Sequence, residues 1–212
     1  MTSGSRAPDP DASTGVPERQ VRVVLSESTA RVYQAYSDAI ADAALAAQTF
    51  VAPFKRERMT WIKPSFAWMA HRSGWARSPQ QERVLGIDMT RVGFESALSQ
   101  SCPSSFDPSV HESPEQWRAA LRDSAVRVQW DPERTMALER LPYRTIQIGI
   151  SGPAVDAYVD QWIVRIEDVT PLMRRMEQAV AKRDWAEVQA LAPRELPLPL
   201  PIDIARRARC SE

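Results

Sequence analysis

Apolar and polar residues alternate in several short segments of the chain, which predicts β-strands. In one of them, Val126, Val128 and Trp130 share one side while Arg127 and Gln129 occupy the other. Such alternation is typical of a strand that packs one face on a core. The predicted strands are 21–25, 31–36, 59–62, 82–89, 126–130, 143–150 and 163–167.

Helical segments separate these strands, and several begin with a residue that caps helices well. Ser37 or Asp38 precedes an alanine-rich run, and Thr90 precedes a second helix. Ser113 with Pro114 opens a capping-box arrangement. The predicted helices are 38–48, 90–98, 113–121, 155–162, 170–182 and 184–191. Because strands and helices mix without a strict βαβ repeat, we expect an α+β (mixed α/β) domain with a central mixed or antiparallel sheet of about five or six strands, flanked by helices.

The two ends of the chain differ in composition from its middle. Residues 1–19 are rich in Ser, Pro, Asp, Gly and Ala without apolar periodicity, which predicts a disordered tail. Residues 196–201 alternate Leu and Pro, which favours an extended, polyproline-like segment, and 202–209 are predicted to form a last basic turn. We therefore expect a single catalytic-type domain over 20–195 and a proline-rich extended tail over 196–212.

Charge and cysteine content limit the classes of partner. The 27 basic and 27 acidic residues cancel, so no global field draws the protein to nucleic acid or to an anionic membrane. Cys102, in a predicted polar loop, and Cys210, near the end, make no disulfide framework, which favours a reducing cytoplasm. The sequence has neither a signal-peptide pattern nor an apolar run as long as a membrane span, so we expect a soluble, unexported, cytoplasmic protein.

Motifs for nucleotides and metals are absent from the sequence. It contains no P-loop, Rossmann glycine fingerprint, zinc spacing, nucleophile elbow or Ser-His-Asp order. With only seven glycines, phosphate-cradling loops are nearly excluded, and His71 and His111 are too isolated for a histidine-based metal site. We expect no cofactor and no metal.

The densest concentration of unusual residues is the stretch 59–75. It contains three of the seven tryptophans and one of only three lysines, framed as a helix by Pro64 and Gly74. Lys63 and Ser65 stand at the predicted helix start, where free N–H groups can hold an anion or stabilise an oxyanion. We expect Lys63 to be surface-accessible, so that replacing it by Ala would change stability by less than about 1 kcal/mol. The alternative is an ordinary core helix.

Polar residues also stand beside aromatic residues elsewhere in the chain. Gln147 lies among the isoleucines of a strand, where a glutamine is either simply solvent-exposed or part of a row that lines a cleft. The candidate binding residues are Gln34, Tyr36, Trp61, Trp68, Arg72, Trp75, Gln129, Asp131, Glu133 and Gln147.

Six motifs in order resemble one known family. They are Tyr-Gln-Ala-Tyr at 33–36, Met-Thr-Trp-Ile-Lys-Pro-Ser-Phe-Ala-Trp-Met at 59–69 with Arg-Ser-Gly-Trp at 72–75, Gln-Glu-Arg-Val-Leu at 81–85, Gln-Trp-Asp-Pro-Glu-Arg at 129–134, Arg-Thr-Ile-Gln-Ile-Gly at 144–149, and Trp-Ile-Val-Arg-Ile-Glu-Asp-Val-Thr at 162–170. Together they resemble the family catalogued as domain of unknown function 4291. Its fungal members are identified as arginine-containing cyclodipeptide synthases, which join arginine to a second amino acid as a diketopiperazine.

The resemblance implies acyl transfer from an aminoacyl-tRNA ester followed by ring closure. The implied partners are arginyl-tRNA and a second aminoacyl-tRNA. On this basis we assign Lys63 and the N–H groups near Ser65 to oxyanion or phosphate contact. Glu82 and Asp131 are assigned to arginine recognition or base catalysis, and Arg72 to the terminal nucleotide. Either Ser65 or Tyr33 would carry a covalent aminoacyl group. The structural alternative is that Lys63 and Arg72 pair with Glu82 or Asp88.

Two other functions stay open on the sequence. One is a NAD-dependent enzyme like an ADP-ribosyltransferase, because a strand ending at Tyr36, a helix and a later aromatic strand follow that fold's order. Its expected His or Arg in the first strand is absent. The other is a non-catalytic tRNA- or peptide-binding module with a basic rim. The residues of that rim would be Lys55, Arg56, Arg58, Arg72 and Arg77.

Overall fold

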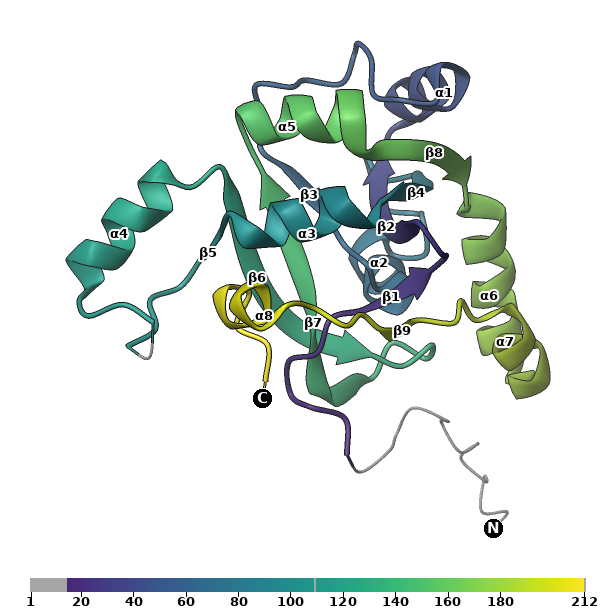
Figure 1. Ribbon diagram of the computed structural model, residues 1–212. Coiled ribbons are helices and arrows are strands. Elements are labelled where there is room, and N and C mark those ends of the chain that lie inside the picture. The colour runs from purple at the N-terminus through teal and green to yellow at the C-terminus, as the bar shows by residue number, and fades with distance from the viewer. Residues whose placement is uncertain (1–14, 109, 212) are drawn as a thin grey trace.

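Two mostly antiparallel sheets form the centre of the molecule (Figure 1). The computed structural model describes residues 15–108 and 110–211. The larger sheet has five strands in the order β8-β4-β2-β1-β9. Their bounds are β8 (Ile163–Asp168), β4 (Arg83–Thr90), β2 (Thr29–Tyr36), β1 (Arg22–Leu25) and β9 (Leu196–Pro197).

The smaller sheet has four strands in the order β3-β7-β6-β5. Their bounds are β3 (Thr60–Ile62), β7 (Arg140–Ile150), β6 (Val126–Arg134) and β5 (Ser101–Pro103). Strand β5 runs parallel to β6, and the other neighbours in this sheet are antiparallel. An isolated bridge between Tyr33 in β2 and Lys63, just after β3, links the two sheets.

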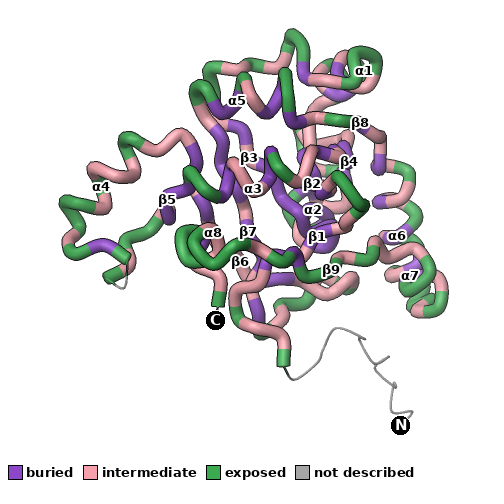
Figure 2. The backbone as a smooth tube through the Cα atoms, viewed as in Figure 1, coloured by how far each residue is buried: buried purple, intermediate pink, exposed green. Residues whose placement is uncertain are grey.

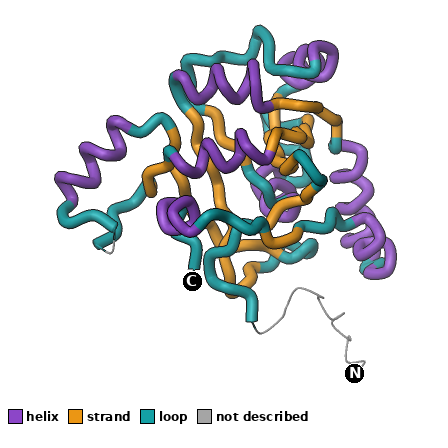
Figure 3. The backbone as a smooth tube through the Cα atoms, in the orientation of Figure 1, coloured by secondary structure: helices purple, strands orange, loops and turns teal. Residues whose placement is uncertain are grey.

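Helices pack against both faces of the larger sheet and against part of the smaller one (Figure 3). Side-chain oxygens of Ser65, Thr90 and Ser113 accept backbone N–H groups at the starts of α2, α3 and α4, as expected for good N-cap residues. Gly74 ends α2 in the left-handed conformation, as predicted. The helix bounds are α1 (Asp38–Ala47), α2 (Phe66–Ser73), α3 (Arg91–Ser99), α4 (Pro114–Asp123), α5 (Pro153–Ala157), the π-helical turn η1 (Tyr158–Trp162), α6 (Thr170–Lys182), α7 (Trp185–Leu191) and α8 (Ile202–Arg207).

Buried side chains lie on both faces of β2, because helices cover the larger sheet on two sides (Figure 2). Val32 belongs to a core cluster that includes Phe94 of α3. Tyr33, the next residue, belongs to a second cluster with Phe66 of α2 and Met173 of α6. The start of α2 is therefore held between the second core and the smaller sheet.

The predicted α+β class is confirmed, and three details of the prediction are wrong. The strands form two sheets rather than one. Cys102, predicted in a loop, lies buried in β5. Strand β6 continues through Pro132, beyond the predicted strand end at Trp130, and the register shifts between Pro132 and Arg134. Proline is tolerated in a strand at such irregular positions, so its presence alone did not end the strand.

The described residues near both ends of the chain pair with strands of the domain. Residues 1–14 of the predicted disordered tail lie outside the described residues, and Arg19 forms a bridge with Arg144. At the other end, the predicted extended segment contains β9, which pairs with β1, Leu198 is buried, and α8 forms where a last basic turn was predicted. Leu198 stabilises this arrangement by joining the main core cluster.

Candidate functional site

The stretch after β3 places Lys63 inside the protein. The side chain is 1% exposed, which corrects the expectation that it is surface-accessible. Its Nζ donates to Asp131 Oδ2 at 3.0 Å and to the Thr145 carbonyl at 3.3 Å, and lies 4.0 Å from the centre of the Trp68 ring. Burial lowers the pKa of the ammonium to about 8, and the Asp131 carboxylate opposes that shift.

Ser65 and Glu133 form a second buried pair beside Lys63. Ser65 Oγ donates to Glu133 Oε1 at 2.7 Å and accepts the backbone N–H of Trp68 at 3.0 Å. The backbone N–H of Arg134 donates to the same Glu133 oxygen at 2.8 Å. Burial raises the pKa of Glu133, which favours its uptake of a proton, although Ser65 and Lys63 oppose the shift. Nucleophilic catalysis requires this kind of arrangement, a hydroxyl within hydrogen-bond reach of a base.

The chain itself occupies the predicted anion position at the start of α2. The Phe66 backbone N–H donates to Glu195 Oε1 at 2.8 Å. A carboxylate is favourable there because the helix dipole is positive at its N-terminus. The expected site for an external anion is thus filled by Glu195, which the sequence reading missed. Its only signal was a single acidic residue before the Leu-Pro run.

A cavity of about 70 Å³ adjoins these groups. It is lined by Ser65, Glu133, Arg134, Tyr143 and Glu195 together with neighbouring residues. The buried Nε of Arg134 has no hydrogen-bond partner among the described residues, while Nη1 donates to the Leu138 carbonyl. Buried donors are normally satisfied, so this guanidinium has capacity to bind a polar atom.

Several predicted residues share the outward face of the smaller sheet. In its register, Gln129 faces Gln147, Asp131 faces Thr145, and Trp61 faces Gly149. Directly paired residues point to the same side, so these side chains form a row that ends at the Lys63 pair. Gln129, Gln147 and Trp61 are half-buried. These polar residues therefore share one sheet face.

Gln34 and Tyr36 lie in a different environment. The Gln34 amide donates to Tyr36 Oη at 2.9 Å and Thr60 Oγ1 at 2.6 Å, and accepts the Tyr158 hydroxyl at 2.9 Å. The hydrogen-bonding groups of these side chains pair with one another beside the core cluster that contains Val32 and Phe94. Burial raises the pKa of Tyr36 and of Tyr158. The sequence assigned Gln34 and Tyr36 to substrate binding, and the structure separates them from the Lys63 pair.

Other predicted residues also lie apart from the buried pairs. Glu82 accepts the backbone N–H of Gln80 at 2.8 Å and so stabilises a turn. Arg72 is exposed on α2, and Trp75 is half-buried just after it. Tyr33 does lie close, since its backbone bonds to Lys63 in both directions, but its ring packs edge-on to Phe66. Burial raises the pKa of Tyr33, which makes it a poorer nucleophile.

Ion pairs settle two remaining expectations about charged residues. Asp88 pairs with Arg31 at 2.7 Å rather than with Lys63 or Arg72. Two members of the predicted basic rim already have carboxylate partners, since Arg56 pairs with Asp160 and Arg77 pairs with Glu177. Their charges are partly compensated within the chain.

The fold and this cluster define the class of protein: a mixed α+β domain with a buried lysine paired to a partly exposed aspartate, and a buried Ser–Glu pair beside a small cavity. The chain belongs to the family described as Domain of unknown function (DUF4291), whose model matches residues 20–198. This match confirms the family that the motifs predicted. No curated protein matches the chain. Within the described residues, none of the helices is long and apolar enough to cross a membrane, and no three metal-binding side chains of His, Cys, Asp or Glu converge.

Proposed function

We propose that the protein transfers an aminoacyl group from an aminoacyl-tRNA and forms an arginine-containing diketopiperazine. The observation that supports this most is the 2.7 Å hydrogen bond from Ser65 to Glu133 at the edge of a cavity. The resemblance of the six motifs to arginine-containing cyclodipeptide synthases supplies the substrate class. The same pair suits acyl transfer, which requires a nucleophile and a base within hydrogen-bond reach.

In the first step, Ser65 Oγ attacks the ester carbonyl of arginyl-tRNA while its proton passes to Glu133. The bond between the carbonyl carbon and the ribose oxygen then breaks, and Glu133 returns the proton to that oxygen. The pKa of Glu133, raised by burial, brings its proton affinity closer to that needed for both transfers. The product of this step is an arginyl ester of Ser65.

The developing oxyanion needs a hydrogen-bond donor next to Ser65. Arg134 lines the cavity and has an unpartnered buried Nε–H among the described residues, so it is the donor that we assign. The Lys63 ammonium, only 1% exposed, adds positive charge where water screens little. The sequence assignment gave oxyanion or phosphate contact to Lys63 and the N–H groups near Ser65, and the proposal adds Arg134 to them.

In the second step, the amine of the second aminoacyl-tRNA attacks the arginyl ester and Ser65 recovers its hydroxyl. Ring closure follows when the arginine amine attacks the remaining tRNA ester and releases the tRNA hydroxyl. Asp131, at the end of the polar row on the sheet face, is the group that we assign to the arginine guanidinium, because its carboxylate is partly exposed beside Lys63.

The direct test is to incubate the protein with tRNA charged with radiolabelled arginine and with a mixture of other aminoacyl-tRNAs. We expect a labelled diketopiperazine. Binding of charged tRNA without product would favour a binding module instead. Consumption of NAD with neither result would favour the transferase that resembles ADP-ribosyltransferases.

A further inference from the structure

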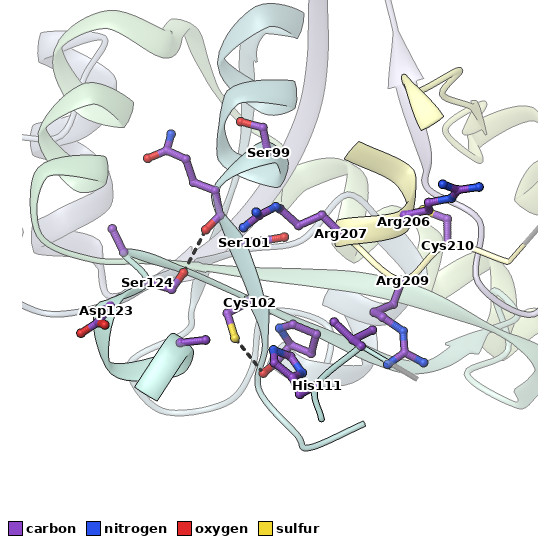
Figure 4. A pocket seen from close by; sticks show the side chains of 15 residues that line it. Ser99, Ser101, Cys102, His111, Asp123, Ser124, Arg206, Arg207, Arg209 and Cys210 are labelled. Atoms are coloured by element: carbon purple, nitrogen blue, oxygen red, sulfur yellow. Dashed lines mark hydrogen bonds between the residues drawn. The ribbon is translucent and has the colours of Figure 1, made fainter. Parts of the chain in front are cut away.

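A second and much larger cavity lies between the edge strand β5, helix α4 and helix α8 (Figure 4). Its volume is about 1020 Å³, and parts of four segments line it: 99–103, 110–111, 120–125 and 206–210. The indole N–H of Trp117 donates to the Pro103 carbonyl at 2.9 Å and fixes α4 against β5. The size is that of sites for small organic ligands.

This cavity is separate from the Ser65–Glu133 pair. Helix α8 is held on the inward face of β6, because the Trp130 indole donates to the Ala208 carbonyl at 2.8 Å. Asp131, the next residue in β6, points to the opposite face and bonds Lys63. A ligand in the larger cavity would therefore lie across the sheet from the proposed acyl transfer.

Positive charge gathers on the α8 side of the cavity. Arg206, Arg207 and Arg209 all line it within four residues. Arg209 pairs with Asp107, but neither Arg206 nor Arg207 has an ion pair within residues 15–108 and 110–211. Figure 4 shows Arg207 extending from α8 toward β5. Burial raises the pKa of the Cys102 thiol in that strand, and the positive charge of Arg207 opposes this shift.

His111 gives independent evidence that the cavity can bind a polar ligand atom. It lines the cavity and is 9% exposed, yet its buried Nδ1 has no hydrogen-bond partner among the described residues. An unpaired buried nitrogen costs free energy that a polar ligand atom would recover. The remaining lining includes Val110, Pro103 and Ala125, which suit a less polar part of a ligand.

We propose that this cavity binds a small organic phosphate of nucleotide size. Arg207 would hold the phosphate group, since guanidinium and phosphate form bidentate, charge-assisted hydrogen bonds. His111 Nδ1 would bond a second polar atom of the ligand, and the apolar lining would contact its body. The proposal does not depend on the acyl-transfer function.

The test is calorimetric titration of the full-length protein with AMP, adenosine and inorganic phosphate as probes. AMP should bind, phosphate should compete with it, and adenosine should bind at least about tenfold more weakly, because a charge-assisted contact is lost. Arg207→Gln should weaken AMP binding by about tenfold or more. Arg183→Gln, the same charge change at an exposed site after α6, should leave it within about twofold.

His111→Phe provides a second check, because it keeps a ring of similar shape and removes Nδ1. It should weaken AMP binding while phosphate alone still binds, and an unfolding curve for each variant shows whether it is folded. The proposal is overturned if neither AMP nor phosphate binds at millimolar concentration, or if Arg207→Gln binds AMP as the wild type does. Binding of intact tRNA through Arg207 without any binding of AMP would also overturn it.

Discussion

Two polar clusters lie on either side of β3, and they differ in whether hydrogen-bonding groups in or beside them lack a partner. The amide cluster consists of Gln34, Tyr36, Thr60 and Tyr158, and its groups hydrogen-bond one another. The charged cluster consists of Lys63, Ser65, Asp131 and Glu133. It borders a cavity, beside a guanidinium nitrogen without a partner among the described residues.

The difference teaches that burial of polar groups does not by itself mark a functional site. A buried network whose donors and acceptors are all used stabilises one packing arrangement. A buried network with titratable groups, shifted pKa values and spare hydrogen-bond capacity can move protons and bind a substrate. The first cluster is therefore expected to respond to mutation through stability, and the second through activity.

The largest expected effect is on product formation when Glu133 is replaced. Glu133→Gln keeps the shape and an acceptor for Ser65 but removes the base, so the rate should fall by about 10²–10⁴-fold. The free energy of unfolding should change by less than about 1.5 kcal/mol. The assay with charged tRNA and labelled arginine measures the rate.

Glu82→Gln is the matched control, because it is the same Glu-to-Gln change made in a turn away from the charged cluster. Its rate should stay within about twofold of the wild type. Equal losses of rate in the two variants, or a wild-type rate in Glu133→Gln, would show that Glu133 is not the base.

The next effect concerns stability against pH. The pKa of Lys63 is lowered from 10.5 to about 8 in the folded protein, so between these values the unfolded chain binds the proton that the folded chain has lost. The free energy of unfolding should therefore rise with pH across this window, by on the order of 3 kcal/mol. Product formation should fall as the pH rises through about 8, because the folded protein loses the ammonium there.

Lys63→Met isolates this contribution, since it fills a similar volume without a titratable group. The pH-dependent gain should appear in denaturant unfolding of the wild type and be missing from the variant. Parallel stability curves for the two proteins would show that Lys63 titrates normally. Lys63→Ala is a poorer choice, because the buried side chain would leave a cavity that costs about 2–5 kcal/mol.

A smaller effect is expected in the amide cluster. Gln34→Leu leaves the fully buried Tyr158 hydroxyl without its partner and should reduce stability by about 1–3 kcal/mol. The rate per folded molecule should not change. Adding Tyr158→Phe should recover part of the stability, and denaturant unfolding of the single and double variants measures this coupling. A large loss of rate with unchanged stability would place Gln34 in the reaction instead.

Local signals explain what the sequence could predict. Thr90, Ser113 and Gly74 marked helix ends because caps depend on neighbouring backbone groups alone. The importance of the stretch around Lys63 was visible from its composition. The pairing of Lys63 with Asp131 could not be predicted, because the two residues are 68 positions apart in the sequence.

Long-range pairing explains what the sequence could not predict. Strand β5 is only three residues long and exists through its parallel pairing with β6. Glu195 reaches the start of α2 across 129 positions, so no local pattern announces it. Gln34 and Gln147 look alike as glutamines in strands, yet one is enclosed by partners and the other lies on an open face.

The most direct test of the central claim is to look for the arginyl ester on Ser65. After brief incubation with arginyl-tRNA alone and acid quenching, peptide mass spectrometry should find arginine attached to the peptide that contains Ser65. The adduct should be absent from Ser65→Ala and greatly reduced in Glu133→Gln. An adduct on Tyr33, or product formed by Ser65→Ala at the wild-type rate, would contradict the account.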